Sequence, residues 1–293
     1  MPARVWTALA GVIVVLLVAV VGLDQWQARR GESSLFGVPW KESRAPAAAP
    51  AAGRPARQRT TSVPAPAPPP VPGTARVAII VDDLGSRRDV FDPLRDIRRP
   101  LTVAVLPGLP LSEWTAREAV QAGMEVLLDL PMEPYRYPEV DPGPGALLMT
   151  MSPRELQQQL GAHLASVPGA VGVTNHMGSR MTEDRQRMRA VLEVLAGRRL
   201  FLVDGLTSNL SVAYDEAKAV GIRASRRHIV IDHTAGEAGD RVRWDEVSWW
   251  AEHRGEVLVI VHGHPLTARL LREYVPRWEA RGLRLVPVSQ LAR

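Results

Sequence analysis

The chain has 293 residues, enough for one large domain with extensions. It contains no cysteine, which excludes disulfides and thiolate metal ligands, so any bound metal must be held by histidine and carboxylate side chains. Residues 1–76 carry nine Lys or Arg and three Asp or Glu, a net charge of +6, which leaves −1 of the total +5 for residues 77–293. The basic balance therefore belongs to the amino-terminal part and favours contact with anionic lipid or wall polymer, whereas the remainder shows no nucleic-acid footprint.

An apolar stretch of 19 residues runs from Val5 to Leu23 and is long enough to cross a bilayer as a helix. Arg4 on its amino flank and Asp24 on the other favour an amino terminus in the cytoplasm, although Arg29-Arg30 oppose this orientation. We predict a single-pass anchor over residues 1–24 in the inner membrane, with the rest in the periplasm or otherwise outside the cytoplasmic membrane. A cleaved signal peptide is the alternative, but no clear A-x-A site follows the stretch.

Residues 25–74 are predicted to be a disordered linker. Pro and Ala dominate residues 41–74, which include three consecutive prolines at 68–70 and show no apolar period of 2 or 3.6. Because Pro-rich chains extend about 3.1 Å per residue, this segment could hold the following domain up to roughly 100 Å from the membrane.

Residues 75–293 alternate strand-like and helix-like segments. Short runs of Val, Ile and Leu predict strands at 77–81, 101–106, 125–128, 171–173, 200–203, 229–231, 257–261 and 284–288. Continuous apolar runs are typical of parallel strands covered on both faces. Ser152 and Glu155 form a capping box, and Ser112, Thr182 and Ser211 mark further helix starts. The pattern predicts an α/β fold, a distorted (β/α) barrel of about seven to eight mostly parallel strands; a doubly wound open sheet is the alternative.

Most predicted strands end in side chains that can titrate or bind a metal. These are Asp82-Asp83, Asp129, Asn175-His176, Asp204, Asp232-His233 and His262-Gly263-His264. The carboxyl ends of parallel strands form the catalytic face of such folds, so this pattern predicts a metal-dependent enzyme.

Adjacent Asp82 and Asp83 point in different directions as they leave a strand, so one carboxylate can bind a metal while the other accepts a proton. A helix cap with a first-turn acid is the alternative. His176, in the segment Asn175-His176-Met177-Gly178-Ser179, is the second candidate ligand, although a lone histidine there is more often structural. Since no H-E-x-x-H spacing occurs, the ligands would have to converge from separate strands.

The remaining polar groups allow more than one role. Asp129 could be a third ligand or a partner of one, and Glu133 could orient a ligand or bind substrate, or the flanking prolines could simply fix its loop. A histidine at 262 or 264 could protonate a leaving group, or both could face the metal. Asp204 could hold one of these imidazoles in its working tautomer.

Three tryptophans at helical spacing, Trp244, Trp249 and Trp250, could stack on a sugar ring. Packing in the core is the favoured interpretation of this cluster. A nucleophilic serine is disfavoured because the sequence has no G-x-S-x-G motif.

The strings VAIIVDDLG, LTVAVLPGLP, EVLLDLPMEP, GVTNHMGSRMT, FLVDGLTSNLSVA and VIVHGHP occur in this order. Together they resemble the divergent polysaccharide deacetylase family, a branch of the carbohydrate esterase deacetylases. The resemblance covers essentially all of 75–293. It implies a distorted (β/α) barrel that uses a divalent metal, usually zinc.

The resemblance also implies roles for individual residues. Asp82 matches the general base, Asp83 and His176 match metal ligands, and His264 would be the general acid. Asp129 is the candidate third ligand. Residues expected to contact substrate are Glu133, Asn175, Ser179, Asp204 and His262. The chain departs from the usual pattern in lacking a His-x-x-x-His ligand pair, in having Asp129 where a histidine or another polar residue is common, and in reading Asp204-Gly205 where Asp-Ser is usual.

These features predict a hydrolase that removes acetyl groups from an N-acetylated envelope polysaccharide such as peptidoglycan. The alternative is a catalytically inactive, membrane-tethered protein that binds a glycan or regulates the envelope. Metal-dependent hydrolysis of another bond is a third possibility, because a fold does not fix a reaction.

Overall fold

The computed structural model describes residues 75–293 except Ala235. The predicted anchor over 1–24 and linker over 25–74 lie outside the described residues. Within the described part of the chain, no helix is both long and apolar enough to cross a bilayer.

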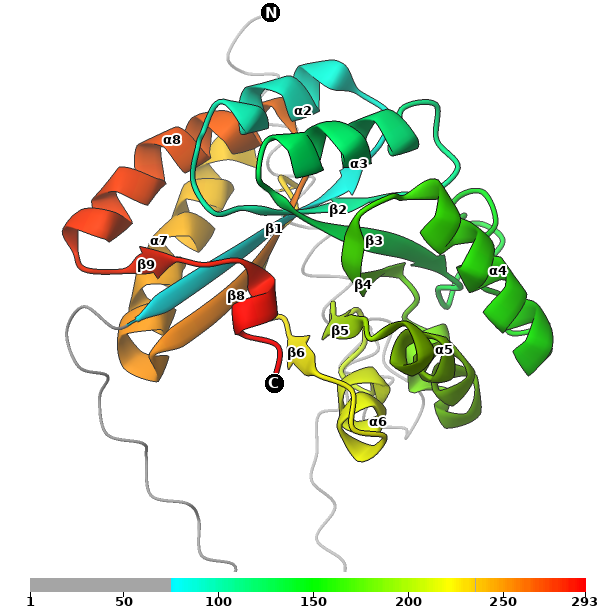
Figure 1. The fold of residues 1–293 in the computed structure, drawn as a ribbon. Helices are drawn as coiled ribbons and strands as arrows, with labels where there is room; N and C mark the ends of the chain where they lie inside the picture. The colour runs from blue at the N-terminus through cyan, green and yellow to red at the C-terminus, as the bar shows by residue number, and fades with distance from the viewer. Residues whose placement is uncertain (1–74, 235) are drawn as a thin grey trace, which may run out of the picture. The chain divides into compact units, whose positions relative to one another are not determined.

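The domain is built on a curved sheet of parallel strands (Figure 1). The strands are β1 (Arg76–Leu84), β2 (Thr102–Val105), β3 (Glu125–Met132), β4 (Ala170–Met177), β5 (Phe201–Asp204), β6 (Ala224–Arg226), β7 (Ile229–Ile231), β8 (Glu256–His262) and β9 (Arg284–Leu285). Their order is β6-β5-β4-β3-β2-β1-β8-β7, with β9 on β1. This is the cyclic order of a (β/α) barrel that is open between β6 and β7. The predicted distorted barrel is therefore present as a parallel half-barrel.

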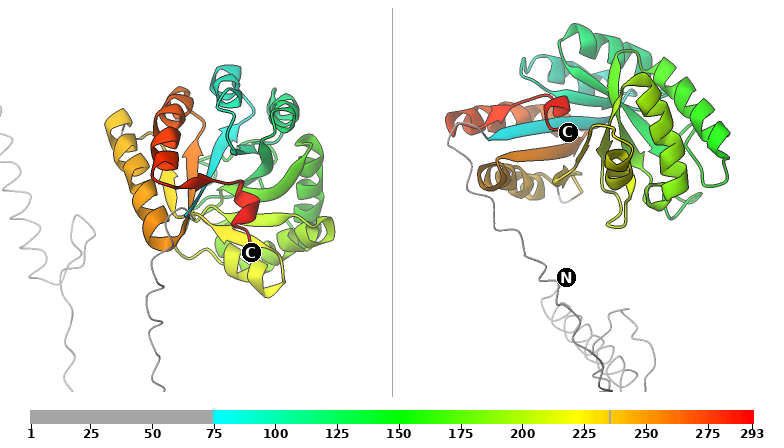
Figure 2. Two further views of the ribbon diagram at one scale, coloured as in Figure 1. Left: turned by 60° about the vertical axis from the view of Figure 1, so that its left-hand side comes forward. Right: turned by 60° about the horizontal axis from the view of Figure 1, so that its bottom comes forward.

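Helices cover the outer side of the sheet (Figure 2). They are α2 (Arg88–Arg95), α3 (Ser112–Gln121), α4 (Pro153–Ser166), α5 (Arg185–Arg198), α6 (Ala213–Ala219), α7 (Gly236–Arg254) and α8 (Pro265–Ala280). The predicted capping box is confirmed, since the Ser152 hydroxyl accepts from Glu155 N and the Glu155 carboxylate accepts from Ser152 N. Such a cap stabilises a helix by about 1 kcal/mol.

Two predicted boundaries are wrong by a few residues. Thr182 lies in a 3-10 turn (Met181–Glu183), and Asp184 caps α5 by accepting from Arg187 N at 2.8 Å. The expected strand over 284–288 is only two residues long and is followed by a second 3-10 turn (Val288–Gln290).

Both faces of the sheet are buried, as the continuous apolar runs predicted. Alternate residues of β1 face different clusters: Val77, Ile79 and Val81 pack with the helices, whereas Ala78 and Ile80 face the inside of the half-barrel. Burying one such side chain contributes about 1.5–3 kcal/mol. Both clusters together therefore hold the strands in register.

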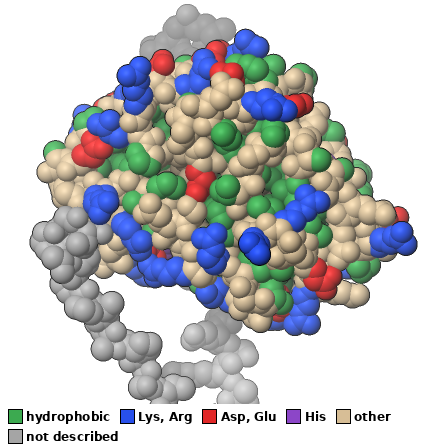
Figure 3. Space-filling model, viewed as in Figure 1, with side chains coloured by type: hydrophobic (Ala, Val, Ile, Leu, Met, Phe, Trp, Pro, Cys, Tyr) green, Lys and Arg blue, Asp and Glu red, His purple; other side chains and the backbone are tan. Residues whose placement is uncertain are grey.

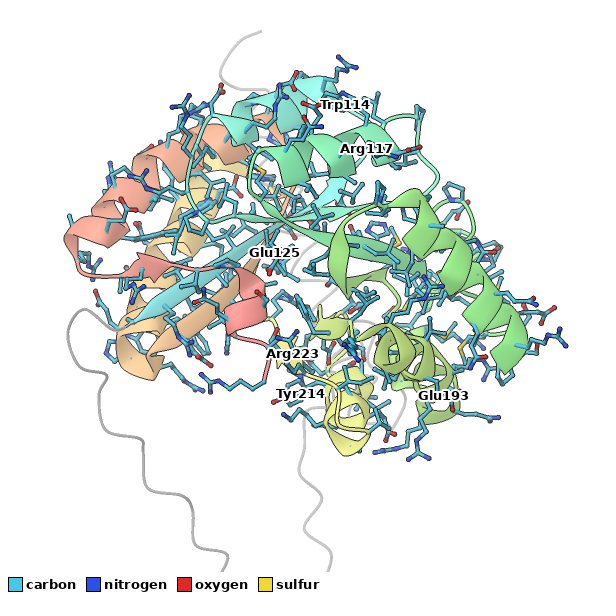
Figure 4. The ribbon with its side chains drawn as sticks, viewed as in Figure 1. Trp114, Arg117, Glu125, Glu193, Tyr214 and Arg223 are labelled. Atoms are coloured by element: carbon cyan, nitrogen blue, oxygen red, sulfur yellow. The ribbon has the colours of Figure 1, made fainter. Side chains whose placement is uncertain are left out.

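The C-terminal segment, residues 284–293, fills the inside of the half-barrel. Val286, Val288 and Leu291 pack in its interior cluster, and Arg293 exchanges backbone hydrogen bonds with Ala224 of β6. Glu125, labelled in Figure 4, accepts from Ser289 N at 3.1 Å. The C-terminal segment closes the amino end of the barrel and leaves the carboxyl end for a site.

Lys and Arg side chains are spread over the face in Figure 3 rather than gathered in one patch.

The tryptophan cluster is divided between core and surface. Trp244 is fully buried and stacks on Trp278 and Tyr274 with ring centroids 5.4 and 5.7 Å away. Trp249 on the same helix is 54% exposed. Core packing therefore accounts for Trp244 and not for Trp249.

Candidate active site

Polar side chains from four strands, β1, β3, β4 and β8, meet at the carboxyl end of the half-barrel. Asp82 of β1 and His262 of β8 are direct partners across the parallel ladder. Asp82 Oδ1 lies 2.8 Å from His262 Nδ1, which makes a hydrogen bond within the site. Because Asp82 is buried and His262 is half-exposed, the imidazole stands between the carboxylate and the entrance.

Asp83 is directed away from Asp82 by an unusual backbone conformation. Its φ of +57° lies in the left-handed region, which costs an ordinary side chain about 1 kcal/mol but which Asp tolerates. Its backbone N–H donates to Asp129 Oδ2 at 3.0 Å. Its two carboxylate oxygens lie 2.7 Å from His176 Nδ1 and 3.2 Å from His262 Nδ1. Asp83 is therefore the centre of the cluster.

The side chains of Asp83, Asp129 and His176 fit a divalent cation. One ligand atom from each lies within 4.8 Å of the others, and Asp82, Asp83 and His262 meet the same criterion. Asp83 Oδ1 and Asp129 Oδ1 are buried and have no hydrogen-bond partner. Asp83 Oδ1 nevertheless has the His176 imidazole as a charged neighbour at 2.7 Å, so Asp129 Oδ1 is the oxygen of the cluster that is left without any polar partner. Carboxylate and imidazole donors suit zinc and similar metals. That these residues bind a metal remains a prediction.

Burial and proximity change the proton affinities of the cluster. Burial raises the pKa of Asp129 to about 8 and also raises that of Asp82. Burial opposes the charge on His176, but the adjacent carboxylates raise its pKa to about 9. The hydrogen bond to Asp82 raises the pKa of His262 to about 9. Burial likewise opposes the charge on Asp83, yet the two imidazoles lower its pKa. Without a metal, the imidazoles thus supply the positive charge that the carboxylates require.

The cluster opens into a cavity of about 360 Å³. Its lining is Asp82, Asp83, Asn175, His176, Met177, Gly205, Thr207, Arg227, Val230, Ile260 and His262. Val230 and Ile260 form an apolar part of the wall, and Arg227 places a guanidinium in it. Arg227 is not among the predicted site residues, because β6, which precedes it, has no apolar run that would predict a strand.

His264, the predicted general acid, does not line this cavity. Its Nδ1 accepts from Leu266 N at 3.2 Å, so it caps α8, and its ring lies 4.6 Å from that of His233. Gly263 separates it from His262, and a Cβ at 263 would lie 2.8 Å from Asp82 O. The structure therefore brings His262, and not His264, to Asp82.

Three of the residues expected to contact substrate hold loops instead. The buried Glu133 accepts from Met149 N at 2.7 Å and from Arg180 at 2.8 Å. Ser179 Oγ accepts from Tyr135 N at 3.1 Å. These bonds secure the segment that follows β3.

Asp204 is also used within its own loop. It accepts from Leu206 N at 2.9 Å and from Ser211 at 3.1 Å, and no hydrogen bond joins it to His262 or His264. The interpretation of Asp204 as the partner of one of these imidazoles is therefore wrong.

Asn175 is both a structural residue and part of the cavity wall. Its side chain accepts from Gly205 N and donates to Met177 O, each at 2.8 Å. Of the five predicted substrate-contact residues, only Asn175 and His262 face the cavity.

The chain belongs to the class of α/β proteins that have a parallel half-barrel with aspartates and histidines at its carboxyl end. Residues 79–292 match the model of the family described as divergent polysaccharide deacetylase, and the protein is a member of that family. This confirms the resemblance.

Similar proteins extend the comparison. The chain is 32% identical over 200 residues to uncharacterized protein YibQ of Escherichia coli K12, a match covering 68% of this chain and 62% of that protein. An uncharacterized protein of Haemophilus influenzae is 29% identical over 198 residues, covering 68% and 70%. The crystal structure of an uncharacterized protein from Agrobacterium tumefaciens C58 has a TM-score of 0.71 at 24% identity, covering 75% of this chain and 89% of that one. The last comparison shows a shared fold.

Proposed function

We propose that this protein is a metal-dependent hydrolase that removes acetyl groups from an N-acetylated envelope polysaccharide such as peptidoglycan. The observation that supports it most is the convergence of Asp83, Asp129 and His176, with the buried Asp129 Oδ1 left without a partner, beside the Asp82–His262 pair. Membership of the polysaccharide deacetylase family supports the choice of substrate class.

In this proposal Asp83, Asp129 and His176 hold the cation, and zinc suits their donor atoms. When bound, the cation polarises the amide carbonyl and makes a water molecule more acidic. Asp82 accepts the proton of the attacking water, and its raised pKa makes it a stronger base than an ordinary carboxylate.

His262 is the proposed general acid in place of His264. Its raised pKa keeps it protonated at neutral pH, so it can donate a proton to the departing amine as the C–N bond breaks and acetate leaves. Val230 and Ile260 provide an apolar surface for the acetyl methyl group. We further propose that the apolar stretch 5–23 anchors the protein in the inner membrane, with this domain outside the cytoplasm.

The metal assignment is tested by elemental analysis of the full chain and of the Asp83→Ala and His176→Ala variants, together with acetate release from an N-acetylated glycan. We expect one bound metal in the wild type and loss of both metal and activity in each variant. Full metal occupancy in both variants would refute the ligand set.

A second candidate function is glycan binding without catalysis. It is favoured by the donor set, in which Asp129 has its pKa raised to about 8 and must lose a proton before it can bind a cation. Metal-loaded protein that bound an envelope glycan and released no acetate from it would support this second function.

A further inference from the structure

Arg227 places a positive charge in the wall of the candidate active site. It follows β6, at the opening of the half-barrel, and its backbone N–H donates to Asp204 O at 3.0 Å. Its side chain lines the same cavity as Asp83 and His176. A guanidinium at this place can contact whatever occupies the cavity.

The Arg227 guanidinium is fixed by backbone groups alone. Its Nε donates to Gly205 O at 2.6 Å, and its Nη2 donates to Leu206 O at 2.8 Å. Since a guanidinium has five N–H groups, three remain for a ligand. The two carbonyls therefore hold the group in one orientation without neutralising its charge.

No carboxylate of the described residues pairs with this guanidinium within 4.0 Å. The adjacent Arg226 differs, because its guanidinium lies 3.4 Å from Asp204 Oδ2 and 3.6 Å from Asp215 Oδ2. Burial lowers the pKa of Arg227, although the more distant Asp204 and Asp82 oppose this. A partly buried cation without a counter-ion is an unfavourable arrangement that a bound anion would correct.

The position of Arg227 separates it from the group to be hydrolysed. The acetyl group must reach the donors Asp83, Asp129 and His176, whereas the Arg227 guanidinium is more than 4.0 Å from every carboxylate oxygen of the cluster. Arg227 is thus in the same cavity as the cluster without pairing with it, so its free N–H groups are available to a group of the substrate other than the acetyl carbonyl that the donors receive. The planar fork of an arginine matches the two oxygens of a carboxylate.

We propose that Arg227 binds a carboxylate carried by the glycan, so that the substrates are acidic N-acetylated polysaccharides. This inference rests on the proposed function, because it names the substrate class of the same site.

The first test compares two probes on the wild-type full chain. One is a tetrasaccharide of alternating N-acetylglucosamine and N-acetylmuramic acid with free lactyl carboxylates, and the other is the same tetrasaccharide with these carboxyls reduced to alcohols. Calorimetry in EDTA prevents the carboxylate from binding a metal. We expect the acidic probe to bind about tenfold more tightly, as a charge-assisted bidentate contact provides. Equal affinities, or a preference that appears only with zinc, would overturn the proposal.

The second test changes the arginine. In Arg227→Gln the preference for the acidic probe should fall to within about twofold, while affinity for the reduced probe stays unchanged. Arg223→Gln is the matched control, since Arg223, labelled in Figure 4, lies just before β6. Its guanidinium lies over the Phe201 ring, and it is not among the residues that line the cavity. This control should keep the full preference. An equal loss for both probes in Arg227→Gln would show a merely structural role and overturn the proposal.

Two further outcomes are distinguishable. If Arg227→Gln weakens competition by acetate but keeps the preference for the acidic probe, Arg227 binds the product and the proposal fails. If Arg227→Gln does not fold, Arg227→Lys replaces it: the preference for the acidic probe should fall because the bidentate contact is lost, and an unchanged preference would overturn the proposal. Preference for the acidic probe without acetate release from either would support this inference and refute the hydrolase, whereas equal affinity with acetate release would do the reverse.

Discussion

The two ends of the half-barrel are built from the same strands but have opposite character. At the carboxyl end, Asp82, Asp83 and His262 line an open cavity of about 360 Å³. At the amino end, the C-terminal segment fills the interior with Val286, Val288 and Leu291. A larger cavity of about 650 Å³ lies on the amino-end surface, but its lining contains no histidine and only one carboxylate. Chemistry, and not cavity size, therefore identifies the site.

This contrast implies that residues at the carboxyl end set activity and residues at the amino end set stability. Four of the six described non-glycine residues with positive φ, Asp83, Met177, Leu206 and His233, lie near the carboxyl ends of their strands, whereas Arg98 and Arg199 precede β2 and β5. Strained non-glycine residues persist where the surrounding structure holds them, as at functional sites. Substitutions at the two ends should separate the two properties.

The largest expected effect is that of His262→Asn. Removal of the proposed general acid should lower kcat for deacetylation about a thousandfold, because proton donation contributes about 10²–10⁴. Metal content should stay at the wild-type level, since Asp83, Asp129 and His176 remain. Acetate release and elemental analysis on the same sample test both points. A variant that lost its metal would instead make His262 a ligand.

The next effect in size is that of Leu291→Ala at the amino end. Leu291 is 5% exposed and packs in the interior cluster, so the change should lower the free energy of unfolding by about 2–4 kcal/mol. Metal content and kcat should be unchanged. The control is Leu210→Ala, because Leu210 is 69% exposed and its loss should cost about 0.5 kcal/mol or less. Urea denaturation measures the stability of both variants. A fall in kcat for Leu291→Ala would contradict the idea that the amino end affects stability without affecting activity.

In the metal-free protein, the free energy of unfolding should depend on pH through the titratable groups at the carboxyl end. The pKa of both His176 and His262 is raised to about 9, so their charged forms stabilise the fold below the ordinary histidine pKa of about 6.5. This stabilisation is lost as pH rises through about 9. Asp129, with its pKa raised to about 8, acts in the same direction.

The urea concentration at the midpoint of unfolding, measured in EDTA, should therefore decrease as the pH is raised from 6.5 to 9.5. The fall should be smaller in His176→Asn. Zinc-loaded protein should show a smaller fall, because the metal binds the neutral imidazole of His176 and replaces its charge, whereas His262 still loses its proton near pH 9. A midpoint that rises with pH in EDTA would show that the imidazoles are not protonated in the folded state.

The sequence was sufficient to predict the parallel strands and most of the cluster. Continuous apolar runs fix both the strand type and the edge at which Asp83, Asp129 and His176 emerge, so their convergence follows from the topology. The sequence did not predict β6, because its residues Ala224–Arg226 contain no apolar run. For the same reason it did not place Arg227, which follows β6, in the site.

The choice between His262 and His264 also required the structure. Two histidines separated by one residue have the same parity in a strand, so periodicity alone directs both to the same face. The structure ends β8 at His262, after which the chain turns at Gly263 into α8. The second histidine thereby becomes a helix cap.

The smallest expected effect is that of His264→Ala, and it decides between the two histidines. Loss of the bond from Leu266 N should lower the free energy of unfolding by about 1 kcal/mol, as for other helix caps. Because His262 and Asp82 are untouched, kcat should stay within about twofold of the wild type, in contrast to the thousandfold effect of His262→Asn. Denaturation and acetate release on the two variants side by side provide the comparison. A loss of a hundredfold or more in kcat for His264→Ala, with the fold intact, would return the general acid to His264 and place it within reach of the substrate only after α8 has moved.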